Sequence, residues 1–341
     1  MKRRNTILFI LLGIATIVLF LVDLAVGSEP IPLEEVWQAL FGSADAATPW
    51  SNIVRVFRLP KAVMALLAGA ALSTVGLQMQ TLFRNPLAGP YVLGVSAGAS
   101  LGVSIMVLGL PLLGISMSDP MVQNIGVAGA AWIGSALIMA VVMAVTSRIK
   151  NIMTVLILGM MFGSAASALV EIMQYLSPES ALKSYVVWTM GSLGGVTNAQ
   201  LQIVVPIVLV GLVLSVMLIK PLNILLLGEN YARTMGLNIK RTRLMVTLTT
   251  VLLAGTITAF CGPIGFVGLA VPHVARMLFR EADHRVLVPA TMLCGTTIML
   301  LCDIATSLFS GNLTLPINTV SALVGITIVV TVIFRNRKMM M

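Results

Sequence analysis

Long apolar runs alternate with short polar, proline- or glycine-containing segments along the whole chain. A run of about 20 apolar residues is long enough to cross the hydrocarbon core of a bilayer as a helix. The runs are continuously apolar and lack the alternation of lipid-facing strands, which favours helices over a membrane barrel. The pattern predicts ten membrane-spanning helices, near residues 6–26, 62–82, 91–113, 121–146, 152–176, 200–219, 244–262, 264–279, 286–310 and 316–334.

The composition supports a membrane protein. Of the 341 residues, 58% are hydrophobic and 10% are charged, whereas soluble domains carry about 25% charged residues. The first run could belong to a signal peptide, but its apolar core is longer than the about 7–15 residues typical of one, so we expect an uncleaved first span. We therefore expect an all-α polytopic membrane protein with a single transmembrane domain over residues 1–341.

The distribution of charge predicts the orientation of the chain. With ten spans and a cytoplasmic N-terminus, the cytoplasmic side receives all but four of the 21 Lys and Arg residues. This asymmetry is what the positive-inside rule expects, and it places both termini in the cytoplasm. The net charge of +9 then reflects membrane topology, and nucleic-acid binding is not expected. The four outer basic residues are Arg55, Arg58, Lys61 and Lys183.

Three connecting segments are long enough to have a role. In the outer loop 27–61, the apolar positions between residues 33 and 41 predict a short interfacial helix. The outer loop 177–199 also predicts a short helix before its glycines. The inner loop 220–243 contains apolar residues such as Tyr231 and Met235 among its basic residues. This mixture favours a docking surface over a solvated connector.

Two common motifs of enzymatic chemistry are absent from the sequence. It has no glycine-rich phosphate cradle ending in Gly-Lys-Ser/Thr and no His-Glu-x-x-His. We expect no enzyme and no metal or other cofactor in this chain, because its cysteines and histidines lack ligand spacing: Cys261, Cys294, Cys302, His273 and His284.

Acidic residues within the spans bear on the class of transporter. Ion-coupled transporters usually place ionisable residues at mid-membrane depth. Here Asp23, Glu171 and Asp303 fall near the predicted outer ends. This placement disfavours a secondary transporter, without excluding one that binds sodium through neutral groups.

Three local features are candidate functional elements. Gly94, Gly98 and Gly102 recur at every fourth position, a pattern that lets two helices pack closely in lipid. The Arg-Asn-Pro corner at residues 84–86 is typical of a turn between two spans. Arg58 and Lys61, at the start of the second predicted span, are either cations that extend to the membrane interface or a docking site for an acidic partner.

Several segments together resemble one family, the permease subunits of bacterial iron-siderophore, haem and vitamin B12 ABC importers. The similarity covers nearly the whole chain, and the combination of segments is specific although no single segment is. The segments that carry it are 58–102 (beginning RLPKAV and containing RNPLAGPYVLG), 187–196 (VWTMGSLGGV), 228–243 (GENYARTMGLNIKRTR) and 262–289 (GPIGFVGLAVPHVARMLFREADHRVLVP).

The resemblance implies ten spans in the cytoplasmic membrane of a bacterium or archaeon. It implies a dimer with a second copy or a paralogous permease, two ATPase subunits that bind ATP, and a substrate-binding protein on the outer face. It also implies roles for individual residues. These are a cytoplasmic gate at Asn85 and Leu87, docking of the binding protein at Arg58 and Lys61, and ATPase coupling at Gly228, Glu229, Ala232, Arg233 and Gly236.

Two departures from the family pattern affect these expectations. Ser307 stands where the family often carries an outer arginine, and the last span lacks the usual Pro-Phe-Phe ending, which puts its role in the pathway in doubt. We expect a permease that carries an iron-siderophore or related metal chelate inward, with cobalamin or haem as alternative cargoes. An ion-coupled secondary transporter and a non-transporting scaffold are the alternatives from other classes.

Overall fold

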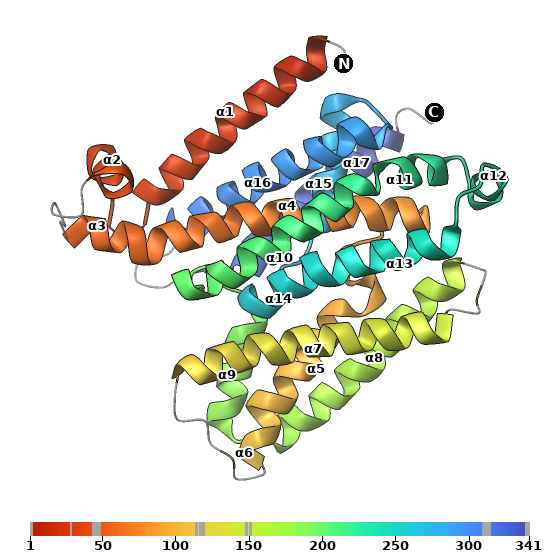
Figure 1. Cartoon of the computed structure of the whole chain (residues 1–341). Coiled ribbons are helices and arrows are strands. Elements are labelled where there is room, and N and C mark those ends of the chain that lie inside the picture. Colours follow the sequence, from red (N-terminus) through yellow and green to blue (C-terminus); the bar gives the residue numbers. More distant parts are fainter. Residues whose placement is uncertain are drawn as a thin grey trace. The chain divides into compact units, whose positions relative to one another are not determined.

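The computed structural model describes residues 3–27, 29–42, 49–112, 115, 120–146, 149, 152–308 and 315–337. Over these residues the chain is built from helices joined by turns, without a strand (Figure 1). The helices are α1 (Arg3–Ala25), α2 (Leu33–Phe41), α3 (Pro49–Ile53), η1 (Val54–Arg58), α4 (Leu59–Phe83), η2 (Pro90–Leu93), α5 (Val95–Ser104), η3 (Ile105–Gly109), α6 (Leu110–Leu112), α7 (Pro120–Thr146), α8 (Ile152–Leu176), α9 (Glu179–Thr189), α10 (Asn198–Met217), α11 (Ile219–Leu226), α12 (Glu229–Thr234), α13 (Ile239–Thr250), η4 (Val251–Gly255), α14 (Thr256–Cys261), α15 (Val267–Phe279), α16 (His284–Leu308) and α17 (Ile317–Arg337).

The apolar helices agree with the predicted spans. Two shorter apolar helices, Val267–Phe279 and Ile317–Thr331, fall in the predicted ranges 264–279 and 316–334. In the described part of the chain, the other eight predicted ranges each contain a helix long and apolar enough to cross a membrane, which confirms the polytopic helical fold. The ends predicted at residues 113 and 310 lie outside the described residues. The eight long helices are Arg3–Ala25, Pro49–Phe83, Val95–Leu112, Ile125–Val145, Met153–Leu176, Asn198–Met217, Ile239–Cys261 and His284–Leu308.

The second span begins earlier than the sequence predicted. The expected start was residue 62, but α3, η1 and α4 form one continuous helix from Pro49 to Phe83. Two arginines, Arg55 and Arg58, made this stretch look like a polar loop. Both donate hydrogen bonds to backbone carbonyls of neighbouring segments, so the helix accommodates them. The short helix predicted between residues 33 and 41 is confirmed as α2.

The chain divides into two compact units. Unit 1 contains Met1–Leu77, Ser192–Pro206 and Ile264–Met341, and unit 2 contains Gln78–Gly191 and Ile207–Pro263. Both α4 and α10 contribute residues to each unit. The single domain expected over residues 1–341 stays a prediction.

In unit 1, α16 packs against α1, α15 and α17, and α4 approaches its neighbours through glycines. A Cβ atom on Gly69 of α4 would lie 2.2 Å from the carbonyl oxygen of Gly295 in α16. A Cβ atom on Gly76 would lie 1.7 Å from the carbonyl oxygen of Gly268 in α15. Only glycine allows backbones to approach this closely, and such contacts supply the dispersion energy that holds helices together in lipid.

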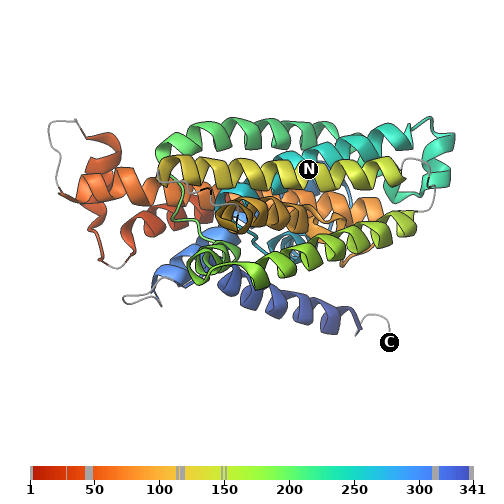
Figure 2. The same ribbon diagram turned by 90° about the horizontal axis from the view of Figure 1, so that it is seen from below.

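A small hydrophobic cluster closes the end of unit 1 where α1 finishes. Leu24 from α1 packs with Val36 and Ala39 from α2, and with Val54 and Ala62 from the long helix. Figures 1 and 2 show α2 and α3 gathered at this end of α1. The cluster fixes the first turns of the long helix, which carry Arg58 and Lys61.

In unit 2, α5 packs against α7 and α8. A Cβ atom on Gly98 would lie 2.5 Å from the carbonyl oxygen of Gly134, and one on Gly102 would lie 2.0 Å from that of Ala130, both in α7. Gly94 has a φ of 82°, which suits glycine, and precedes the first turn of α5. The glycine stripe thus lies at the contacts that hold α5 in place.

The contact between α5 and α7 can be tested with one methyl group. Gly98→Ala places a Cβ atom against the Gly134 carbonyl, so the helices must separate, and we expect unfolding to become easier by about 1–3 kcal/mol. Gly129 of α7 has open space around its Cα, so Gly129→Ala should be neutral or slightly stabilising. Thermal unfolding of the two purified variants in detergent makes the comparison, and equal transition temperatures would contradict this packing.

Candidate functional site

Arg58 holds the end of α1. Its Nη1 donates to the carbonyl oxygens of Leu24 at 2.9 Å and Ala25 at 2.7 Å, and its other terminal nitrogen donates to the Glu29 carbonyl. The last carbonyls of a helix have no partner within the helix and carry partial negative charge. A guanidinium group supplies both hydrogen-bond donors and a positive charge to these carbonyls. Arg58 therefore connects the long helix to the C-terminus of α1.

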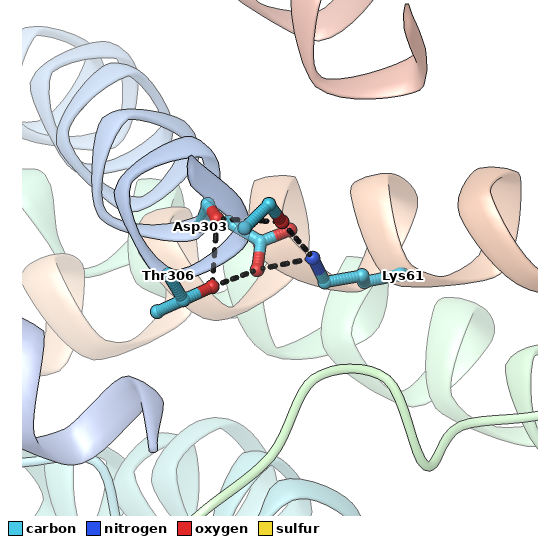
Figure 3. A network of polar contacts seen from close by, with 4 residues as sticks. Lys61, Asp303 and Thr306 are labelled. Carbon is cyan, nitrogen blue, oxygen red and sulfur yellow. Dashed lines mark hydrogen bonds and ion pairs between the residues drawn. The ribbon is translucent and has the colours of Figure 1, made fainter. Parts of the chain in front are cut away.

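Lys61 lies one turn further along and pairs with α16 (Figure 3). Its Nζ is 3.0 Å from Oδ1 of Asp303 and donates to Oγ of Ser307 at 2.9 Å. The hydroxyl of Thr306 also lies 3.3 Å from Asp303 Oδ1. The Asp303 side chain is 1% exposed and that of Lys61 is 25% exposed. A buried carboxylate needs such a cation, because leaving either charge alone in this environment costs several kcal/mol.

A second carboxyl group joins this network from α1. Asp23 is 5% exposed and lies close enough to Asp303 to interact with it electrostatically. No motif in the sequence pairs these two residues, and only the packing of α1 against α16 brings them together.

The Arg-Asn-Pro corner ends α4 with a Schellman turn. The Asn85 N–H donates to the Gln80 carbonyl at 3.2 Å, and the Arg84 N–H donates to the Thr81 carbonyl at 3.3 Å. Arg84 has a φ of 49°, a left-handed conformation that costs about 1 kcal/mol for a residue other than glycine. The Asn85 side chain accepts from the Leu87 N–H at 2.9 Å, which orders the turn. Leu87 itself is 53% exposed.

The side chain of Arg84 gives this corner a second role. Its Nη2 donates to the carbonyl oxygens of Leu225 at 3.2 Å and Leu226 at 3.3 Å, at the C-terminus of α11. The structure therefore joins the corner that holds Asn85 and Leu87 to the segment 220–243. We call residues 220–243 the coupling segment, after the role that the sequence resemblance implies.

Within the coupling segment, α12 is held at its N-terminal end. Gly228 precedes it with a φ of 111°, and Glu229 in its first turn accepts a hydrogen bond of 2.6 Å from Nη2 of Arg243 in α13. Ala232 is fully buried, whereas Gly236 has a φ of 82° and open space around its Cα. Arg233 lies 3.9 Å from Glu229 along the same helix.

Several exposed residues of the coupling segment are apolar, beside exposed basic ones such as Arg233. Tyr231 is 68% exposed and Met235 is 56% exposed, and Leu226 and Leu227 are exposed beside them. An aromatic residue, a methionine and two leucines in one short segment resemble the centre of a protein–protein interface. Of the three small residues singled out from the sequence, only Gly236 is free to approach another chain.

A groove of about 850 Å³ runs along unit 2 between η2, α5 and α8. Its floor includes Gly94 and the backbone of α8 at Gly159 and Gly163, and a Cβ atom on Gly94 would lie 3.3 Å from the Gly159 carbonyl oxygen. Polar side chains line its length: Ser96, Ser164, Ser167 and Glu171. The sequence analysis considered Glu171 only by its depth in the membrane and did not single out Ser164 and Ser167, although the spacing of three and four residues places all three on one helix face.

Helix α9 lies beside the same two helices. Tyr185 is buried and hydrogen-bonds through its hydroxyl group to the side chains of Ser100 in α5 and Gln174 in α8. Burial raises the pKa of Tyr185, although these two hydrogen bonds oppose the shift, so the phenol stays protonated at neutral pH. Tyr185 therefore fixes the spacing of α5 and α8.

The described part of the chain holds no cluster of three His, Cys, Asp or Glu side chains suited to a metal ion. In the described part of the chain, Cys261, Cys294 and Cys302 are buried and form no disulfide.

Comparison with known proteins identifies the class of protein. The profile of the FecCD transport family matches residues 15–335. The chain is 31% identical to the hemin transport system permease protein HmuU of Yersinia pestis, over 94% of this chain and 95% of that protein. It is 32% identical to the vitamin B12 import system permease protein BtuC of Klebsiella pneumoniae, over 98% and 96%. The chain belongs to the FecCD transport family.

Further similarities agree with this assignment. The Fe(3+) dicitrate transport system permease protein FecD of Escherichia coli is 30% identical, over 97% of this chain and 98% of that protein. A metal-chelate type ABC transporter in an inward-facing conformation superposes with a TM-score of 0.82 at 27% identity, covering 96% of this chain and 99% of that one. As a FecCD protein, the chain is a multi-pass membrane transport subunit, as the sequence predicted.

The structure also explains one departure from the family pattern. Ser307 stands where the family often carries an arginine, and its hydroxyl accepts a hydrogen bond from Lys61. Lys61 thereby gains a neutral partner beside Asp303 where an arginine would repel it. The roles inferred for Arg58, Lys61, Asn85 and Leu87 stay predictions.

Proposed function

We propose that this FecCD protein is the permease subunit of an ABC importer that carries a metal chelate, such as an iron-siderophore, haem or cobalamin, into the cytoplasm. The observation that carries the proposal is the match to the family over residues 15–335, which leaves almost no part of the chain for another activity. Among the described residues, no group of three His, Cys, Asp or Glu side chains is placed to hold a metal ion. ATP would be bound and hydrolysed by partner subunits.

The assembly that we propose has two permease copies, two ATPase subunits on the cytoplasmic side and a binding protein on the outer side. Both termini and the coupling segment would lie in the cytoplasm, as the positive-inside rule requires. The membrane would be the cytoplasmic membrane of a bacterium or archaeon. The second copy would be identical or a paralogue, and the groove along α5 and α8 would face the passage between the copies.

In this proposal the coupling segment transmits movement of the ATPase to the gate. The exposed Tyr231 and Met235 would dock on the ATPase, and the buried Ala232 and the Glu229–Arg243 hydrogen bond make α12 move as a rigid element. The Arg84 guanidinium then passes the displacement of α11 to the corner that carries Asn85 and Leu87. Switching of this kind needs a rigid element with two positions and no covalent step.

The proposed function is tested by reconstitution. We expect the chain, assembled with the ATPase and binding-protein subunits encoded beside its gene, to take up haem, cobalamin or ferric dicitrate into liposomes. Uptake should require both ATP and the binding protein, and the permease alone should give none. Gradient-driven uptake by the permease alone would overturn the proposal in favour of a secondary transporter, and failure of all three cargoes in an ATPase-active complex would overturn the cargo class.

The link through Arg84 is tested in the same assay with Arg84→Gly. Glycine adopts the left-handed turn without strain, so the corner should stay folded while both hydrogen bonds to α11 are lost. We expect ATP hydrolysis to continue and uptake per ATP to fall about tenfold, since two charge-assisted hydrogen bonds are removed. Arg84→Ala, which keeps the strain, should be equally uncoupled but less stable. Normal uptake per ATP in Arg84→Gly would show that the link is unnecessary.

Docking of an acidic binding protein at Arg58 and Lys61 must be compatible with the contacts that both side chains already make. We expect Arg58→Gln combined with Lys61→Gln to weaken association and flatten its salt dependence, whereas Arg58→Lys with Lys61→Arg should retain both. Lys61→Gln alone should also lower stability by about 3 kcal/mol, because Asp303 loses its cation. Thermal unfolding measures the effect on stability, and titration with the binding protein measures the effect on association. Lower stability with unchanged association would assign these cations a purely structural role.

A further inference from the structure

Three polar side chains form a stripe on α8 inside a membrane-spanning segment. Ser164, Ser167 and Glu171 follow at intervals of three and four residues, so they share one helix face, and all three are exposed. The apolar residues Leu169 and Ile172, 53% and 57% exposed, lie on the other side of the same helix. Helix α8 is therefore amphipathic within the span Met153–Leu176.

The stripe lies in the groove of about 850 Å³ and faces α5 across it. From that side, the Ser96 hydroxyl and Tyr91 complete a lining of hydroxyl groups and small residues. Glu171 is the one charged side chain among the described residues that line the groove. It lies five residues before the end of α8 at Leu176, about 8 Å along the helix axis.

Glu171 needs water around its carboxylate. In the described part of the chain it makes no ion pair or hydrogen bond, and its side chain is exposed. A bare carboxylate in contact with lipid tails costs several kcal/mol, so a charged residue within a span almost always faces a water-filled space or a partner. The serine hydroxyl groups beside it make this face of the groove polar, which is compatible with water around the carboxylate.

We propose that Glu171 makes this groove selective by charge, favouring metal chelates of neutral or positive net charge over anionic ones; this rests on the proposed function, in which the groove faces the passage. The carboxylate acts over a distance of several ångströms between low-dielectric walls, where a unit charge influences another far more strongly than in bulk water. The hydroxyl groups bind the polar periphery of the chelate. In a dimer, two such carboxylates face the same passage.

The experiment measures the charge preference of the groove without requiring transport. Ser167→Cys places a thiol one helical turn from Glu171, in the complete permease reconstituted in liposomes. Its rates of reaction with a cationic reagent, 2-aminoethyl methanethiosulfonate, and an anionic one, 2-sulfonatoethyl methanethiosulfonate, give a ratio. The effect of Glu171 on the thiol itself cancels in this ratio. Variants carrying only the buried native cysteines give the background.

We expect Ser167→Cys to react and Leu169→Cys, on the lipid-facing side, to remain unreactive. We expect Glu171→Gln to lower the ratio of cationic to anionic rate about tenfold, while Glu34→Gln, on α2, leaves it unchanged. Equal labelling of both cysteines, no labelling at Ser167→Cys, or an unchanged ratio in Glu171→Gln would each overturn the proposal. If Glu171→Gln changes the ratio of cationic to anionic labelling rate but the permease fails the uptake assay, the charge preference of the groove would still hold. Only the proposed metal-chelate cargo would then be wrong.

Discussion

The carbonyl groups at the C-terminal ends of helices impose the constraint on which much of this structure depends. A helix leaves its last carbonyls without internal partners, and a bilayer offers few donors to satisfy them. In this chain arginines from other segments supply the donors. Arg58 bonds to the end of α1, Arg84 to the end of α11, and Arg4 to the Phe279 carbonyl that ends α15. Arg55 does the same for α2 through the Ala39 carbonyl.

These contacts change how the basic residues should be interpreted. Counted along the sequence, arginines report topology, because they gather on one side of the membrane. In the structure, the same side chains also join helices that are far apart in sequence, such as Arg84 and α11. The two roles are compatible, since helix ends and membrane surfaces coincide. A basic residue beside a span is therefore also a candidate connection between helices.

The sequence predicted the helices well because each depends on local apolar length, as the agreement between range 152–176 and α8 illustrates. It also placed the short helix at residues 33–41, where apolar positions recur at helical spacing. It placed the start of the long helix too late, because the carbonyl partners of Arg55 and Arg58 lie in other segments. The Asp23–Asp303 pair could not be predicted, since 280 residues separate its members and only packing joins them.

In the candidate site too, the features that depend on local sequence were predictable and the contacts between distant segments were not. The corner at Asn85 was recognisable as a turn, but its connection to α11 depends on a side chain whose targets are 141 residues away. The α8 stripe was available in principle, because Ser164, Ser167 and Glu171 keep helical spacing. It was missed because Glu171 was assessed only by its depth in the membrane. Depth gives the position of a charge along the membrane normal, whereas spacing shows which other residues lie on the same face of the helix.

Arg84 shows how strain and coupling are related in this fold. A Schellman turn ordinarily ends on glycine, and an arginine at that position costs about 1 kcal/mol. Glycine would relieve the strain but could not reach the carbonyls of Leu225 and Leu226. The two hydrogen bonds from a charged donor offset the strain and make the turn sensitive to where α11 lies. A turn built this way is more stable when α11 is in place than when it moves away, so the conformation of the corner depends on the position of the coupling segment.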